Sequence, residues 1–161
     1  MNKRVLTGVM TALAVLVAAV IFYLSSQPAE SSAKTSGGVT EWMLRLFSPG
    51  YADLSSREQM ELLKKYEEPV RKAAHGLEFA ALGACLFLAL HGFRVRRAPV
   101  WALLGGALYA CMDEAHQMLV DGRGPALSDV GIDTGGVLFG VLAGLMLLAI
   151  FHHFWPARGD A

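Results

Sequence analysis

Residues able to carry out chemistry are concentrated in one stretch of the chain, which reads YACMDEAHQMLVDGRGPALSDVGIDTGG over 109–136. Apolar runs of membrane-spanning character lie on both sides of it. In hydrocarbon each ionisable side chain costs on the order of 2.5–3.5 kcal/mol, so this concentration predicts a site and not a simple anchor. Its polar members are Asp113, Glu114, His116, Gln117, Asp121, Arg123, Asp129 and Asp133.

Acid–base catalysis is one chemistry that these residues allow. His116, or His75 farther upstream, would be the general base, and a carboxylate such as Asp113 or Glu78 would orient it. Arg123 would stabilise negative charge on a phosphate. A divalent metal held by Asp, Glu and His is a variant of this chemistry, but no HExxH or paired CxxC motif specifies one. The metal ligands and the cofactor therefore stay open.

Binding without catalysis is the other chemistry, and it is the function that we favour. Arg123, with Arg71 and Lys72, would hold a phosphate or carboxylate of a lipid headgroup. Carboxylates would orient these cations and position polar groups of the ligand. The predicted binding residues are Lys72, Glu114, Gln117, Arg123, Asp129 and Asp133.

The elements that must position these residues are predicted to be membrane-spanning helices. The chain has 161 residues, 54% of them hydrophobic, and the apolar residues fall into four blocks. We predict an all-α membrane helix bundle, a single domain over 1–161, with four spans and an external polar loop. The spans are placed at 5–24, 73–93, 99–119 and 129–155, and the loop at 25–72.

The charge distribution and the length of the first apolar run argue against a nucleic-acid-binding protein and against a cleaved leader. The net charge is zero and the basic residues form no stripe with interleaved aromatics, so nothing indicates a nucleic-acid partner. A secretory signal, cleaved near Ser31-Ser32-Ala33, is the alternative for the first apolar run. That run exceeds the usual 7–15 residues of a signal's apolar region, so we favour a retained helix.

The loop before the second span is predicted to be flexible at first and helical later. Pro28 ends the first helix, and a Ser/Gly-rich segment follows it. An amphipathic piece over 41–47 and a capping box, Ser55-x-x-Glu58, begin two short helices, the second ending before Pro69. We expect both helices to lie on the membrane surface, with Leu62, Leu63 and Tyr66 facing the acyl chains.

Charge near the spans predicts the orientation. Lys3 and Arg4, the three arginines at 94, 96 and 97, and Arg158 would be cytoplasmic, although Arg71 and Lys72 make the count uneven. Both termini are then cytoplasmic. The polar ends of the spans share the external leaflet, so a through-membrane transport path is disfavoured.

Helical periodicity assigns faces to the polar residues. Asp129 and Asp133 stack one turn apart, above Gly136, Gly140 and Gly144, whose spacing favours close helix packing. These aspartates are predicted to point into the bundle. For single residues, simpler roles stay open: Asp129 as a helix cap and Arg123 as a snorkelling side chain.

At these residues the chain resembles the VanZ-like family of small bacterial membrane proteins. The motifs that carry the resemblance are Phe22-Tyr23-Leu24-Ser25-Ser26-Gln27-Pro28, Arg71-Lys72, Ala74-His75, Glu78-Phe79, Leu82-Gly83, Tyr109, Asp113-Glu114, His116-Gln117, Gly122-Arg123, Ser128-Asp129-Val130, Asp133 and Gly136. They extend over almost the whole chain. None of the charged positions of the pattern is missing.

The resemblance implies a protein of the bacterial cytoplasmic membrane that acts at its outer face. The family takes its name from a protein that lowers susceptibility to teicoplanin, a lipid-bearing glycopeptide. The implied partners are a membrane lipid, a lipid-linked envelope precursor or a glycopeptide antibiotic. Resistance and lipid binding are accordingly expectations from the resemblance, while the enzyme acting on a lipid-linked substrate stays the alternative.

Overall fold

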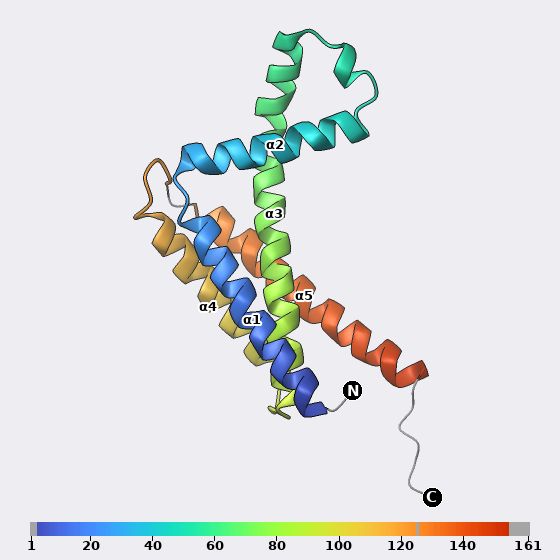
Figure 1. Ribbon diagram of the computed structural model, residues 1–161. Helices are drawn as coiled ribbons and strands as arrows, with labels where there is room; N and C mark the ends of the chain where they lie inside the picture. Colours follow the sequence, from blue (N-terminus) through green and yellow to red (C-terminus); the bar gives the residue numbers. More distant parts are fainter. Residues whose placement is uncertain (1–2, 125, 155–161) are drawn as a thin grey trace, which may run out of the picture.

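The chain folds into α-helices joined by short connections (Figure 1), in a computed structural model that describes residues 3–124 and 126–154. No strand occurs in these two ranges, so the all-α prediction is confirmed. The five helices are α1 (Lys3–Ser25), α2 (Ala29–Phe47), α3 (Ser56–Gly92), α4 (Ala98–Gln117) and α5 (Leu127–Phe154), with a short 3-10 turn at Tyr51–Asp53. Residue 155, where the last span was expected to end, and Arg158 lie outside the described residues.

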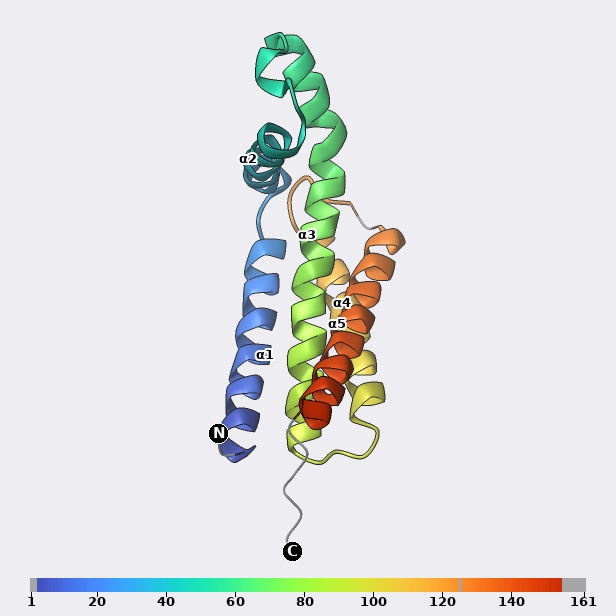
Figure 2. The ribbon, with the colours of Figure 1, turned by 90° about the vertical axis from the view of Figure 1, so that its right-hand side faces the viewer.

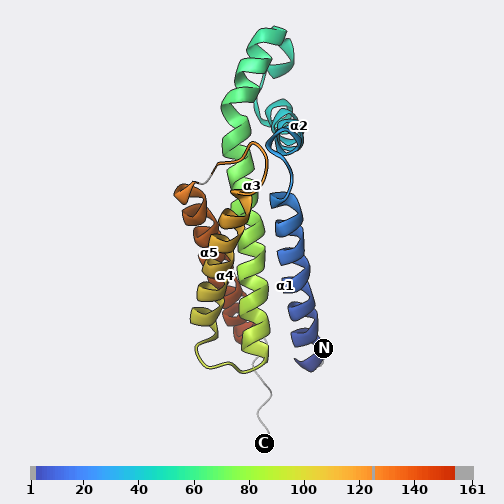
Figure 3. The same ribbon diagram turned by 90° about the vertical axis from the view of Figure 1, so that its left-hand side faces the viewer.

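Four helices form a bundle and the fifth crosses one end of it. Successive bundle helices α1, α3, α4 and α5 run up and down, and α2 lies across the end at which α1 and α4 finish (Figures 1 and 2). The described ends of the chain, Lys3 and Phe154, are both at the opposite end. Figure 3 shows α3 passing between α1 and the pair α4 and α5, so α3 is the central helix.

Three of the helices are long and apolar enough to cross a membrane. These are α1, α3 and α5, by length and composition over the described residues. The predicted third span, now α4, does not meet this measure, because Asp113, Glu114, His116 and Gln117 all fall in its last turns. The outward faces of α1 and α5 expose large apolar side chains, including Leu16 at 58% and Phe139 at 65%, as expected of helices that contact lipid.

The packing of α3 against α5 depends on glycine. A methyl group at Gly136 would come within 2.2 Å of the Gly76 carbonyl oxygen, and one at Gly140 within 1.9 Å of the Ala80 carbonyl oxygen. Gly144 differs from these two glycines, because it faces the side-chain ring of Phe87 and not backbone. The predicted close approach along this stripe is therefore confirmed, and the two backbones touch where only glycine fits.

Two predictions about the loop at 25–72 were wrong. Its Ser/Gly-rich part is not flexible but forms the first half of α2. The following helix does not end before Pro69 but continues without a break from Ser56 to Gly92. Proline removes one backbone hydrogen bond, but α2 packs against this stretch, where Ser36 Oγ donates to Glu67 Oε1 at 3.3 Å, and tertiary packing outweighs the loss.

The predicted start of this helix is confirmed. Ser55 and Glu58 form the capping box in both directions, between each side chain and the other residue's backbone N–H. At about 1.5 Å per residue the helix is roughly 55 Å long, well beyond a 30 Å hydrocarbon core. Its first turns therefore extend beyond the bundle, as Figure 1 shows.

Candidate functional site

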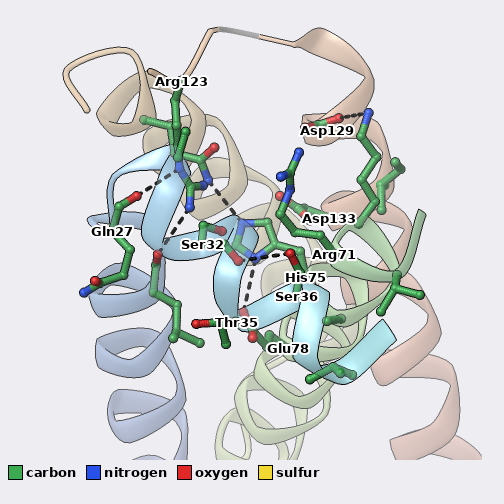
Figure 4. Close-up of a pocket in the computed structure, with 18 of the residues that line it drawn as sticks. Gln27, Ser32, Thr35, Ser36, Arg71, His75, Glu78, Arg123, Asp129 and Asp133 are labelled. Carbon is green, nitrogen blue, oxygen red and sulfur yellow. Dashed lines mark hydrogen bonds and ion pairs between the residues drawn. The ribbon is translucent and has the colours of Figure 1, made fainter. Parts of the chain in front are cut away.

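A cavity of about 400 Å³ lies at the end of the bundle that α2 crosses. Figure 4 shows polar side chains converging on it from α2, α3, α5 and the connections after α1 and before α5. Its lining combines cations, acids, one histidine and small hydroxyl residues. They are Gln27, Ser32, Thr35, Ser36, Arg71, Lys72, His75, Glu78, Gln117, Arg123, Asp129 and Asp133, with apolar contributions from Leu24, Val39, Val70 and Ile132.

His75 lies at the centre of the acidic side of the cavity. Its Nδ1 is 3.1 Å from Glu78 Oε2, and its Nε2 is 3.3 Å from Asp113 Oδ2. The amide nitrogen of Gln117 lies 3.2 Å from the same Nε2. Both ring nitrogens are therefore engaged by groups of the protein, which orients the ring and leaves neither nitrogen free as a base.

Asp113 connects three helices just behind the cavity lining. Its Oδ2 accepts hydrogen bonds from Ser25 Oγ of α1 at 2.9 Å and from Gln117 Nε2 at 3.0 Å. Asp113 is 4% exposed, and its other oxygen, Oδ1, is buried without a hydrogen-bond partner. The result is a buried carboxylate with one saturated and one unused oxygen.

Asp133 faces the same centre from α5. It is 2% exposed, lines the cavity, and its Oδ1 is buried without a hydrogen-bond partner. One ligand-capable atom from each of His75, Asp113 and Asp133 lies within 4.8 Å of the other two. These are the residues of the described chain that are placed to hold a metal ion.

Cations occupy the mouth of the cavity. Lys72 Nζ is 2.9 Å from Asp129 Oδ1 and 3.2 Å from Glu68 Oε1. Arg123 is held differently, because its Nε donates to the Gln27 carbonyl at 3.1 Å and its Nη2 to the Leu24 carbonyl at 3.5 Å. Asp129 thus pairs with a neighbouring helix in addition to standing in the first turn of α5.

Arg123 and Arg71 keep charge available for a ligand. Neither forms an ion pair with a carboxylate in the part of the chain that the structure describes. Burial lowers the pKa of Arg123, and the nearby charge of Arg71 lowers it further, while Asp113 and Glu114 act in the opposite direction. An arginine pKa lies so high that the group stays charged, so two guanidinium groups that repel each other flank one cavity.

Two hydrogen bonds of neighbouring residues hold the backbone on either side of Arg123. Gly122 has φ +75°, a conformation that side-chain-bearing residues rarely adopt, and the Asp121 carbonyl accepts from the Ala29 N–H at 3.2 Å. Glu114, buried in α4, accepts from the Ala126 N–H. Glu114 was predicted as a binding residue, but it lies off the cavity and anchors the connection that carries Arg123.

His116 also lies off the cavity. Its Nε2 is 3.0 Å from Ser26 Oγ, and its ring stacks on Phe22 with centroids 4.6 Å apart. Of the four predicted catalytic candidates, the structure brings together His75, Glu78 and Asp113 and separates His116 from them. Among the predicted binding residues it gathers Lys72, Gln117, Arg123, Asp129 and Asp133 at the cavity.

Sequence reasoning missed the contribution of α1 and α2. Ser25 is 1% exposed and bonded to Asp113, and Ser32, Thr35 and Ser36 of α2 line the cavity. The three hydroxyl residues of α2 recur at helical spacing, a signal that the Ser/Gly-rich composition of the segment obscured.

Apolar helices around a polar, partly enclosed cavity are the architecture of a helical integral membrane protein with a site near one membrane face. The model of the VanZ/LLP1 family matches residues 10–151, so the chain belongs to that family. The matched range includes most of α1, the cavity lining and most of α5. Comparison with proteins of curated function and with solved structures found no match.

Proposed function

We propose that this protein binds the anionic headgroup of an envelope lipid, or of a lipid-linked cell-wall precursor, at the outer face of the cytoplasmic membrane. The cavity at the α2 end of the bundle is the binding site. The observation that carries the proposal is the convergence of Arg71, Lys72 and Arg123 on one cavity, two of them without a carboxylate partner among the described residues.

The side chains of the lining suit a ligand that carries an anionic group with hydroxyl groups beside it. Guanidinium groups match phosphate and carboxylate oxygens through paired N–H donors. Ser32, Thr35 and Ser36 add hydroxyl groups to the same lining. The outer faces of α1 and α5 are apolar, so the acyl or prenyl chain of the ligand would remain in the membrane beside them.

A four-span topology with both termini cytoplasmic is part of the proposal. The helices α1, α3, α4 and α5 alternate in direction, which supports it (Figure 1). The cavity and Gly124 would then be external. The exposed apolar residues Trp42 and Phe47 of α2 would rest on the membrane surface.

Labelling a cysteine at Gly124 tests this topology. A side chain there meets nothing within 4 Å, so Gly124→Cys should be tolerated. In a background of Cys85→Ala and Cys111→Ala, we expect an impermeant maleimide to react from outside intact spheroplasts. A cysteine at Arg96, in the opposite connection, should react only after the cells are opened. The reverse pattern would place the cavity in the cytoplasm.

Headgroup binding is tested with farnesyl phosphate and purified protein in detergent. Loss of one charge-assisted contact costs about 1.5–3 kcal/mol, so Arg123→Gln should weaken binding roughly 10- to 100-fold. Arg45→Gln, which removes an exposed arginine paired with Glu41 far along α2, is the matched control. Native mass spectrometry or a thermal-shift titration gives the affinity.

Farnesol, which lacks the phosphate, separates headgroup recognition from hydrophobic adsorption. Equal affinity for the phosphate and the alcohol would contradict the proposal, as would equal weakening by the Arg45 variant. In cells, the same proposal predicts that a sensitive host carrying the protein becomes less susceptible to teicoplanin, and that Arg123→Gln removes the protection at matched membrane levels.

Catalysis on a lipid-linked substrate is the second candidate, favoured by the contact between His75 and Glu78. In the structure His75 Nε2 also faces Asp113, so turnover would require that contact to open. Release of product from the lipid phosphate or diphosphate, lost in His75→Gln, would establish the enzyme. Binding without product supports the first candidate.

A further inference from the structure

We infer that His75, Asp113 and Asp133 form a divalent metal site at the base of the cavity. One ligand-capable atom of each residue lies within 4.8 Å of the other two. The three come from α3, α4 and α5, so an ion there would join the three helices that enclose the site. The backbone contacts of Gly136 and Gly140 in α5 with Gly76 and Ala80 in α3 lie next to it along both helices.

Two unused oxygens point to a ligand. Asp113 Oδ1 and Asp133 Oδ1 are both buried without a partner, and their residues are 4% and 2% exposed. A buried charged oxygen left without a hydrogen bond is costly. These two atoms would coordinate a cation without giving up any bond that they make now, whereas His75 Nε2 would exchange its contacts with Asp113 Oδ2 and Gln117 Nε2 for the metal ion.

The surroundings of the three residues resemble the outer shell of a metal site. A histidine that binds a metal through one nitrogen usually donates the other N–H to a carboxylate. Glu78 Oε2 stands 3.1 Å from His75 Nδ1 in that role, which directs Nε2 at Asp113. Ser25 and Gln117 both donate to Asp113 Oδ2 and orient its other oxygen.

Charge balance favours a cation. Asp113, Asp133 and Glu78 place three carboxylates around a single imidazole, and no lysine or arginine of the described chain forms an ion pair with any of them. Even a protonated imidazole would leave excess negative charge in a buried position. A divalent ion bound between these carboxylates would neutralise that charge.

The donor set selects the class of metal. One imidazole with two carboxylates suits Zn²⁺ or Mn²⁺, whereas Ca²⁺ takes six to eight oxygen ligands. Ligands about 2.0–2.2 Å from Zn²⁺ would be about 3.4 Å apart in a tetrahedral site, so ligand atoms that now lie within 4.8 Å of one another must approach by up to about 1.4 Å. Three protein ligands leave a coordination position that faces the cavity.

Metal uptake by the purified protein tests the site without any lipid. After stripping with EDTA, the wild type should take up one Zn²⁺ or Mn²⁺ per chain, measured by inductively coupled plasma mass spectrometry. Asp133→Asn and His75→Gln should each weaken binding by at least the roughly 10- to 100-fold that an outer-shell change produces. Glu78→Gln should weaken metal binding by an amount within that range. Asp53 is an exposed acid far from the cavity, so Asp53→Asn should bind the metal like the wild type.

X-ray absorption at the zinc edge adds a readout that a purely structural role would not move. We expect a first shell of nitrogen and oxygen with one imidazole. Sulfur in that shell would assign the metal to Cys85 or Cys111 and overturn the site. Uptake by the wild type no greater than by an Asp113→Asn/Asp133→Asn variant that remains monodisperse would overturn it as well. If the wild type takes up the metal but does not bind farnesyl phosphate, the proposed function is rejected and the metal site stands.

Discussion

Replacing Gly140 by alanine is expected to separate α3 from α5 and to destabilise the protein more than any other single methyl addition. The new Cβ would lie 1.9 Å from the Ala80 carbonyl oxygen and 2.9 Å from the Ala84 nitrogen. These are backbone atoms, so no side chain can rotate away. Overpacking of this kind costs about 1–3 kcal/mol and sometimes more, and thermal unfolding in a mild detergent measures the loss.

Gly135 on the same helix provides the matched control. A Cβ there meets nothing within 4 Å, and alanine is favoured over glycine in a helix by roughly 0.5–1 kcal/mol. Gly135→Ala should therefore unfold at the wild-type temperature or slightly above it. If the two variants unfold together, α3 and α5 are not in backbone contact at Gly140.

Removing the charge of Asp113 is the second change with a large expected effect. In metal-free protein, Asp113→Asn replaces the carboxylate that faces His75 and accepts from Ser25 and Gln117. Leaving buried polar groups without their charged partner costs about 1–3 kcal/mol. We expect a loss of that size in the free energy of unfolding, measured in the presence of EDTA.

A double-mutant cycle with His75→Gln assigns that loss to the pair. Residues in direct contact couple by about 0.5–3 kcal/mol, so the second substitution should cost less in the Asp113→Asn protein than in the wild type. Asp53→Asn, at an exposed position, should stay within about 0.5 kcal/mol of the wild type. Strict additivity of the His75 and Asp113 changes would mean that the two side chains are not in contact.

Local patterns in the sequence predicted most of the helical architecture. The apolar runs, the capping box at Ser55 and the glycine spacing from Gly136 to Gly144 each depend on residues three to five positions apart, and each corresponds to an observed element. The boundaries of α1, α4 and α5 differ by only a few residues from the predicted spans. The failures were at Pro69 and in the first half of α2, where packing between helices overrides local preference.

The sequence also determined that polar residues would gather near the ends of the helices, since buried charge in an apolar bundle needs partners. Only the tertiary structure decided which of them meet. Asp113 and His116 lie on one broad polar face of α4, yet Asp113 contacts His75 while His116 stacks on Phe22. The rotation of α4 about its axis, at which Gly106 packs against Val137 of α5, makes that choice, and helical periodicity alone contains no information about it.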